Sequence, residues 1–318
     1  TDVILMFGSL PLKNSQVTSG GVGFHTTKNF LKKCKKRNVK FFNISPTNFE
    51  ADKLVNAEWL KIRPGTDTAF MLGLAYLLEN KNLCNREFLK THCHGYDKFK
   101  DYLLGTNDGI KKDPEWAHTI TGLDKTVFYK IIDIIQNKKV LISGSWSLQR
   151  QQYGEQPHWM IVVLAAMIGQ IGQPGGGFGL GYSAENGIGN PVKHFKWPAL
   201  DQFKNQITDF IPVARYSDML LNPEKNFTFN GQTYQYPNIK LVYWAGGNPF
   251  HHQMNLSKLR KATFKPDTII TNEIWWNSLA RHADIIFPTT TTLERNDIGF
   301  RHWEQTISPM HKAIDTVG

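Results

Sequence analysis

SGSWSLQRQQYGEQPHWMIVVLAAMIGQIGQPGGGFGLGYSAENGIG, residues 143–189, is the stretch that organises the rest of the chain. It begins at the end of an apolar run and passes through a polar segment that holds Trp146, Gln149 and Arg150. An apolar helix is expected over residues 155–171, and the glycine-rich segment 175–179 follows it. This order predicts a strand, a loop, a buried helix and a glycine-rich loop. A polar loop at the carboxyl end of a strand is where open α/β folds usually bind a ligand.

Strands and helices alternate on both sides of this stretch, which predicts an α/β fold of two Rossmann-like units with mainly parallel sheets flanked by helices. In the first unit we expect strands at residues 2–7, 39–44, 59–62 and 139–142, and helices at residues 26–37, 67–79, 85–93, 113–119 and 125–136. The helix at 67–79 is expected to be amphipathic, with Phe70, Met71, Leu74 and Leu78 on one face. In the second unit we expect strands at residues 239–245, 268–272 and 283–287, a helix at 256–262 and a helical turn at 276–281.

The chain length predicts more than one unit. A chain of 318 residues exceeds the size at which a single hydrophobic core stops growing. We expect a first α/β nucleotide-binding unit with a helical cover over residues 1–188. A crossing segment and part of a second α/β nucleotide-binding unit are expected over residues 189–318, because the periodicity weakens between Gly189 and Tyr236. The chain opens directly on a strand without a signal peptide, which suggests a piece of a longer protein.

Charge and cysteine content exclude several classes of protein. The formal net charge of +10 means that an anionic partner has to be considered. The densest basic run, KKCKKR at residues 32–37, is interpreted as the solvated face of a helix, and no nucleic-acid partner is expected. Cys34, Cys84 and Cys93 form no C-x-x-C pair, so their thiolates cannot assemble a zinc ribbon or an iron–sulfur cluster. The longest apolar run is too short to span a bilayer, so no direct membrane insertion is expected.

Five polar loops lie at or just beyond the ends of predicted strands: GSLPLKNSQ at 8–16, ISPTNFE at 44–50, RPGTD at 63–67, SGSWSLQR at 143–150 and AGGNPFHH at 245–252. Each loop alone has the composition of an ordinary turn. Together they resemble a nucleotide-binding edge, because glycines let phosphates approach backbone N–H groups. No loop matches the dinucleotide fingerprint between a strand and a helix, and a Walker A sequence is absent. The sequence therefore does not favour an enzyme that uses NAD or ATP.

No metal site can be read from the spacing of potential ligands. His251 and His252 are adjacent and point apart in either regular structure, and His92 and His94 have no acidic or thiolate partner at metal spacing. Isolated carboxylates such as Glu155 are not paired by the sequence with a second acid. We therefore assign no residue to a metal.

Several long motifs carry a family resemblance. The segments are SWSLQRQQYGEQPHWMIVVLAAMIGQIGQPGGGFG at 145–179, AGGNPFHH at 245–252, ARHADIIFPTTTTLERND at 280–297, CHGYDKFKDYLLGTNDG at 93–109 and DPEWAHTITG at 113–122. In order and content they resemble the molybdopterin oxidoreductases of the dimethyl sulfoxide reductase family, and within it the trimethylamine-N-oxide, biotin sulfoxide and methionine sulfoxide reductase branch. The resemblance covers nearly the whole chain, which looks like a central fragment of such an enzyme.

The resemblance implies a molybdenum-dependent reductase of S-oxides or N-oxides that works in anaerobic respiration in the periplasm. Its cofactor would be molybdenum held by two molybdopterin guanine dinucleotides, with the metal ligand outside this chain, and its electron donor a protein such as a c-type cytochrome. The fragment alone is expected to be inactive. The alternative interpretation is an isolated guanine-nucleotide-binding or interaction module without catalysis.

The resemblance also implies roles for individual residues. Trp146 and Arg150 match positions that face the molybdenum pocket. The first nucleotide would lie against Gly8, Ser9, Asn14, Ser45, Pro46, Thr47, Arg63, Gly65 and Asp67, with Asp67 on the guanine, and the central loop would add Gly144, Ser145 and Gln149. The second nucleotide would lie against Gly246, Gly247, Asn248, His251, Asn272 and Asp284, although relatives usually carry an acid where this chain has Asn272. The backbone of residues 175–179 would pass beside a pterin.

Overall fold

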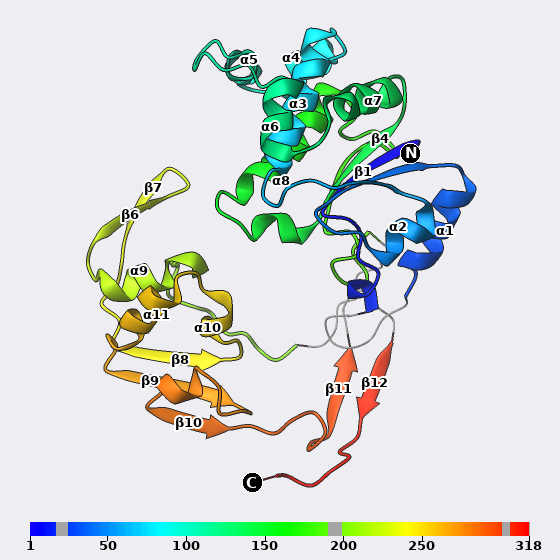
Figure 1. Ribbon diagram of the computed structural model, residues 1–318. Helices are drawn as coiled ribbons and strands as arrows, with labels where there is room; N and C mark the ends of the chain where they lie inside the picture. The colour runs from blue at the N-terminus through cyan, green and yellow to red at the C-terminus, as the bar shows by residue number, and fades with distance from the viewer. Residues whose placement is uncertain (17–24, 190–198, 301–305, 318) are drawn as a thin grey trace. The chain divides into compact units, whose positions relative to one another are not determined.

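The computed structural model describes residues 1–16, 25–189, 199–300 and 306–317 (Figure 1). The chain divides into two compact units, Thr1–Lys196 with Phe300–Ile307, and Trp197–Gly299 with Ser308–Gly318. Both units contain a parallel sheet with helices against it, as the alternating sequence pattern predicts. No helix in the described part of the chain is both long enough and apolar enough to cross a membrane.

The first unit is built on a five-stranded parallel sheet in the order β3-β2-β1-β4-β5. The strands are β1 (Val3–Phe7), β2 (Lys40–Ile44), β3 (Glu58–Leu60), β4 (Val140–Gly144) and β5 (Gly177–Leu180). β1 lies in the middle, and all five of its residues are buried. Val3, Leu5 and Phe7 face one core and Ile4 and Met6 face the other, which explains why β1 is apolar without interruption.

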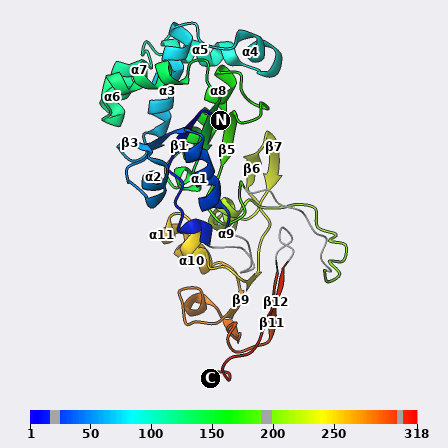
Figure 2. The ribbon, with the colours of Figure 1, turned by 90° about the vertical axis from the view of Figure 1, so that its right-hand side faces the viewer.

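Helices cover both faces of this sheet (Figures 1 and 2). α1 (Thr27–Lys36) and α2 (Glu50–Val55) pack on one face, where Leu31 and Val55 join the smaller core. The other face carries α3 (Asp67–Asn80), α7 (Lys125–Ile135) and α8 (Glu155–Met167). α4 (Arg86–His92), α5 (Tyr96–Leu104) and α6 (Pro114–Thr121) complete the helical cover, and α5 is a helix that the sequence analysis did not predict.

Two expectations about this unit are wrong. α3 is not amphipathic but buried on nearly all sides, because it packs against α6, α7 and α8 as well as the sheet. A Cβ atom on Gly73 would come within 2.7 Å of the Phe128 ring and 2.9 Å of Ala117, so glycine permits this close packing. The glycine-rich segment expected as a loop contains the edge strand β5, whose residues alternate between buried and exposed.

The second unit contains a parallel sheet in the order β10-β9-β8, formed by β8 (Leu241–Ala245), β9 (Thr268–Glu273) and β10 (Ile285–Pro288). α10 (Pro249–His252) and α11 (Leu256–Thr263) follow β8, and α9 (Tyr216–Leu221) packs on α11. β6 (Asn226–Phe229) and β7 (Gln232–Gln235) form an antiparallel hairpin inside the segment whose periodicity is weak. β11 (Asp297–Phe300) and β12 (Ile307–Met310) form a second two-stranded sheet.

The helical cover is held by a buried carboxylate at the end of α3. Glu79, whose side chain is 4% exposed, binds Arg86 through two N–O contacts of 2.8 and 3.0 Å, and accepts from Tyr96 at 2.7 Å. Lys100 lies 3.1 Å from the same carboxylate. Burial alone would raise the pKa of Glu79, but the hydrogen bonds from Arg86, Tyr96 and Lys100 lower it to about 2. The network ties α4 and α5 to α3.

Replacing Glu79 by glutamine is expected to lower the free energy of unfolding at pH 7 by about 2 kcal/mol, because the charge-assisted bonds to Arg86 and Lys100 are lost. The folded-state pKa lies below the unfolded value of 4.5, so the contribution is complete above that pH and is lost as the pH falls toward 2. Urea unfolding at pH 7 and pH 3 checks both statements. Glu115→Gln, which breaks an exposed pair with Lys125, is the control and should leave the free energy of unfolding nearly unchanged.

Candidate functional site

The strand order places a topological switch point between β1 and β4. β2 and β3 lie on one side of β1, whereas β4 and β5 lie on the other. Loops that follow β1 and β4 therefore leave the carboxyl edge in opposite directions, and the crevice between them is the usual ligand site of open α/β sheets. The loop after β1 begins at Gly8, and the loop after β4 begins at Ser145.

Gly8 and Ser145 are in close contact at this switch point. The Ser145 backbone N–H donates to the Phe7 carbonyl over 2.8 Å. Gly8 has φ +82°, and a Cβ atom there would come within 2.7 Å of the Ser145 Cβ and 3.0 Å of the Ser147 Oγ. Only glycine satisfies both the backbone conformation and the space. Gly8 thus lets the start of the loop after β1 lie directly against the loop after β4 at the sheet edge.

The loops after β2 and β3 lie along the same edge. Trp59 donates from Nε1 to the Ser45 carbonyl over 2.9 Å, and the Thr47 N–H donates to the Ser45 Oγ over 3.3 Å. The neighbouring Pro46 is exposed. A Cβ atom on Gly65, in the loop after β3, would come within 2.8 Å of Gln151 Oε1, so the loops after β3 and β4 also approach each other.

Three predicted residues of this edge have side chains used elsewhere or pointing to solvent. The Arg63 guanidinium donates to the carbonyls of Thr119 and Ile120, at 2.7 and 3.2 Å, and so caps the carboxyl end of α6. The Ser9 hydroxyl is buried and donates to Asp52 over 3.1 Å. Asn14 is exposed and begins the 3-10 helix Asn14–Gln16. Sequence reasoning missed Asp52, whose only signal was its place as the third residue of the short helix α2.

Asp67 is the first residue of α3 and is only 5% exposed. Within the described residues, the donor that lowers its pKa is its own backbone N–H. Burial raises the pKa of Asp67 to about 6, because the ionised carboxylate is poorly solvated. A carboxylate buried at the ligand edge without a side-chain donor is placed to receive hydrogen bonds from a ligand.

The central loop presents an exposed aromatic ring and an exposed cation. Trp146 and Gln149 begin and end the 3-10 helix Trp146–Gln149, and Arg150 follows it. Trp146 is 43% exposed, and its indole edge lies against the backbone of Gly181. Gln149 and Arg150 are exposed, and within the described residues no carboxylate lies within salt-bridge distance of Arg150. The guanidinium is therefore available to a negatively polarised ligand atom.

Two buried polar atoms lie beside this loop. Ser143 Oγ in β4 and His158 Nδ1 in α8 have no hydrogen-bond partner among the described residues. The Nδ1 atom of His158 lies 3.5 Å from where a Cβ atom would stand on Gly144. Burial lowers the pKa of His158, which favours the neutral ring. Since buried polar atoms are rarely left unpaired, their partners have to come from outside the described chain.

The second unit brings most of its predicted residues to one edge of its sheet. Gly246 and Gly247 follow β8, with open space where their Cβ atoms would stand, and the Asn248 side chain caps α10 by accepting from Phe250 N–H. His251 is exposed on α10. Asn272, near the carboxyl end of β9, donates to the Tyr243 hydroxyl over 2.8 Å.

Asp284 does not join this group. It precedes β10 and accepts from the Ile269 N–H over 2.8 Å, near the amino end of β9. Asn272 is three residues farther along β9, and three residues of strand span about 10 Å. The sequence motif around Asp284 therefore marks a strand start, and the predicted role of Asp284 in nucleotide binding stays a prediction.

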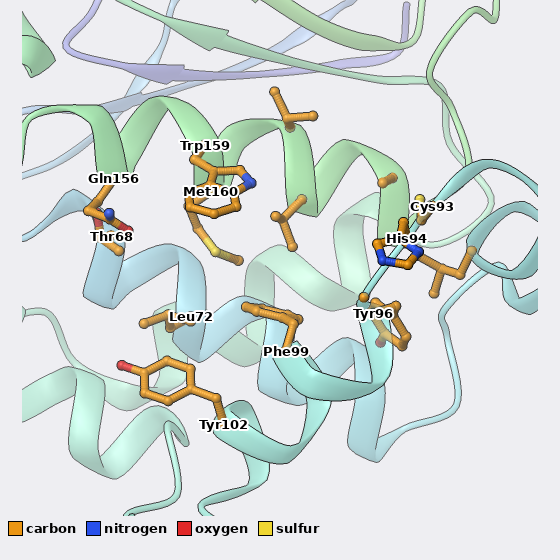
Figure 3. A pocket seen from close by; sticks show the side chains of 15 residues that line it. Thr68, Leu72, Cys93, His94, Tyr96, Phe99, Tyr102, Gln156, Trp159 and Met160 are labelled. Atoms are coloured by element: carbon orange, nitrogen blue, oxygen red, sulfur yellow. The ribbon is translucent and has the colours of Figure 1, made fainter. Parts of the chain in front are cut away.

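A cavity of about 430 Å³ lies within the helical cover (Figure 3). Thr68 and Leu72 from α3, Phe99 and Tyr102 from α5, and Trp159 and Met160 from α8 line it. Its walls are mostly apolar and carry no lysine, arginine or carboxylate. The described residues contain no group of three or more His, Cys, Asp or Glu side chains that could hold a metal ion.

The chain is similar to known proteins over its whole length. The family model described as molybdopterin oxidoreductase matches residues 1–318. A biotin sulfoxide reductase from Cereibacter sphaeroides is 41% identical over 318 residues, which cover 100% of this chain and 43% of that protein. A trimethylamine-N-oxide reductase from Haemophilus influenzae is 39% identical over 309 residues, covering 94% and 37%. The chain thus spans about two-fifths of the length of these curated relatives.

Among solved structures, acetylene hydratase from Pelobacter acetylenicus is similar with a TM-score of 0.56, covering 99% of this chain and 44% of its own. The sequence identity between the two chains is 16%, so this likeness concerns the fold alone.

Proposed function

Because the chain belongs to the molybdopterin oxidoreductase family, we propose that it is the central cofactor-binding portion of a molybdenum enzyme that reduces S-oxides or N-oxides. Relatives named for biotin sulfoxide and for trimethylamine N-oxide, both about 40% identical, support this substrate class. The reaction consumes two electrons and two protons and releases water. When bound, the molybdenum cofactor supplies the two-electron chemistry of this reaction.

The observation that carries the proposal is the buried carboxylate of Asp67 at the carboxyl edge of the first sheet, which receives no hydrogen bond from another side chain of the described residues. The implied cofactor fits this edge. Gly8 and Gly65 let the loops after β1, β3 and β4 approach one another there, and the carboxylate of Asp67 calls for donors that a guanine ring provides through N1–H and the N2 amino group.

We propose that the guanine dinucleotide form is bound, with one nucleotide on each unit. In the first unit Ser45, Pro46, Thr47 and Asp67 would hold a nucleotide, and Gly144, Ser145 and Gln149 would lie beside it. In the second unit Gly246, Gly247, Asn248, His251 and Asn272 would do the same, and the open space at the two glycines supports this. The net charge of +10 suits a cofactor with several phosphates.

Arg150 and Trp146 have the properties needed beside the reacting oxide. The exposed guanidinium of Arg150 would donate hydrogen bonds to the oxide oxygen, where negative charge is concentrated. Trp146 would form an apolar wall that excludes water from the oxide. Electron delivery by a c-type cytochrome, a role in anaerobic respiration and a periplasmic location are further parts of the proposal, and they rest on the family resemblance.

The test is the composition of the full-length protein purified from cells that make the molybdenum cofactor. We expect molybdenum together with guanine nucleotide released by acid. Guanine nucleotide without molybdenum would instead support a binding module without catalysis, and the absence of both would overturn the proposal. Reduction of trimethylamine N-oxide and of biotin sulfoxide by the same preparation, with a reduced dye as electron donor, then identifies the preferred oxide.

A further inference from the structure

Asp52 on α2 is a buried carboxylate that no part of the proposed chemistry uses. It is 3% exposed and accepts three hydrogen bonds. Its Oδ1 accepts from Ser9 Oγ over 3.1 Å, and its Oδ2 accepts from Asn43 Nδ2 over 2.6 Å and from the Phe49 N–H over 2.7 Å. Asp52 therefore links the loop after β1 to the end of β2 and to the start of α2.

Ser9, which donates a hydrogen bond to Asp52, has an unusual backbone conformation. Ser9 has φ 64°, in the left-handed region that residues with a Cβ atom rarely adopt. It follows Gly8, which has φ 82°, so two successive left-handed residues turn the chain away from β1 at the switch point. The hydroxyl of Ser9 is turned inward to Asp52, and the residue as a whole is only 1% exposed, so the hydroxyl is not available to a ligand. The effect of Ser9 on the site is therefore on the course of the loop that follows Gly8.

The same carboxylate also orders the loop after β2. Asn43, which is fully buried, donates from Nδ2 both to Asp52 and to the Thr47 carbonyl, the latter over 3.2 Å. Its Oδ1 atom has no hydrogen-bond partner among the described residues, so the two donated bonds fix the direction of the amide. Two loops of the nucleotide edge thus depend on one side chain that lies beneath them.

We propose that Asp52 is a positioning residue of the nucleotide site: by holding Ser9 in the left-handed conformation and Asn43 against Thr47, it fixes the backbone that receives the anionic part of the cofactor. The inference rests on the proposed function, since it concerns the same edge of the sheet. It assigns the effect of Asp52 to loop geometry and not to contact with the ligand.

Two substitutions of Ser9 separate the role of its hydroxyl from the role of its backbone conformation. Ser9→Ala removes the hydroxyl and retains a Cβ atom that disfavours φ 64°, whereas Ser9→Gly removes the hydroxyl and adopts that φ freely. In the full-length protein loaded with cofactor, we expect Ser9→Ala to speed the loss of molybdenum and guanine nucleotide about tenfold. Ser9→Gly should remain within about twofold of the unmodified protein. Equal losses in both variants would mean that the hydroxyl itself matters, and would overturn the inference.

Two substitutions of Asp52 test the carboxylate in the same assay. Asp52→Leu removes all three acceptor contacts and should speed cofactor loss about tenfold, like Ser9→Ala. Asp52→Asn is the conservative variant. Its oxygen can accept from Asn43 and Phe49 while its amide donates to Ser9 Oγ, so it should restore retention to near the original level.

Val55→Ala, in the same helix and core, controls for loss of stability, because it removes apolar volume without touching the loops. At an equal fall in melting temperature it should leave the rate of cofactor loss unchanged. Normal retention in Asp52→Leu, or equally fast loss in Val55→Ala, would overturn the positioning role. If the unmodified protein contains neither molybdenum nor guanine nucleotide, the proposed function fails and the inference fails with it. If the unmodified protein is loaded with cofactor and all variants lose it at the same rate, only the inference fails.

Discussion

Asp67→Asn is expected to empty the first nucleotide site while making the cofactor-free protein more stable. In the loaded protein the ionised carboxylate would accept from two donors on the guanine ring, and an asparagine side chain has one oxygen and presents an N–H₂ group where the second acceptor is needed. We expect the molybdenum and guanine content after purification to fall more than about tenfold, since charge-assisted hydrogen bonds contribute about 1.5–3 kcal/mol each.

The stability effect has the opposite sign because Asp67 is buried without a donor from another side chain. Its pKa is raised from 3.8 to about 6, so the folded protein holds the proton more tightly than the unfolded chain. Folding is therefore favoured at low pH, and stability falls as the pH rises from about 4 to about 6. Above that window the penalty is about 3 kcal/mol, and Asp67→Asn should recover about 2 kcal/mol of it at pH 7.5.

Urea unfolding of the cofactor-free full-length protein between pH 4 and pH 8 measures the stability effect, and metal and nucleotide analysis measures the loss of cofactor. Asp101→Asn, at an exposed position on α5, is the matched control and should change neither quantity. Unaltered molybdenum and guanine content in Asp67→Asn would remove Asp67 from the guanine site.

Much of the fold follows from local patterns in the sequence. The strands of the two parallel sheets other than β5 were predictable, and β1 shows why most clearly, because a strand buried on both faces is an uninterrupted apolar run, as in Val3–Phe7. The family was predictable for a different reason, since long ordered motifs specify it, and the match of the family model to residues 1–318 confirms it. The burial of α3 on all sides was not predictable, because it depends on three helices that lie far away in sequence.

Other elements escaped prediction because their sequences carry no clear period. Only two of the four residues of β5 are buried, and its glycines resemble a loop. The hairpin β6-β7 has one buried residue, Phe227, so neither of its strands shows a strong alternation.

The candidate site was likewise predictable only in part from the sequence. The glycines and the polar loops are visible in sequence because each follows an apolar strand. Asp52 was missed, because nothing in the surrounding residues tells that the loop after β1 returns to α2. The different ends of β9 at which Asp284 and Asn272 lie were not visible in sequence, because a motif states which residues follow one another but not which end of a strand they occupy.

Arg150→Ala is expected to lower kcat/KM for oxide reduction by about a hundredfold in the full-length enzyme, with normal molybdenum and guanine content. The guanidinium is exposed at the switch-point loop and has no carboxylate within salt-bridge distance among the described residues, so its hydrogen-bonding capacity is free for the substrate. A donor aimed at the oxygen that gains charge during the reaction typically accounts for a factor of about 10²–10³ in rate. Steady-state kinetics with a reduced dye as electron donor measures the effect.

One further variant separates the charge of Arg150 from its shape, and a second serves as a control. Arg150→Lys keeps the positive charge but loses the planar fork of donors, so we expect about a tenfold loss, between the alanine variant and the unmodified enzyme. Arg37→Ala removes an exposed arginine at the end of α1 and should leave kcat/KM unchanged.

Trp146→Ala should lower oxide reduction without loss of cofactor, because the indole is expected to form a wall of the pocket and not to hold the nucleotide. Normal turnover with both Trp146 and Arg150 replaced would contradict their assignment to the reaction pocket, and a loss of molybdenum in Arg150→Ala would show that this residue holds the cofactor instead of the substrate.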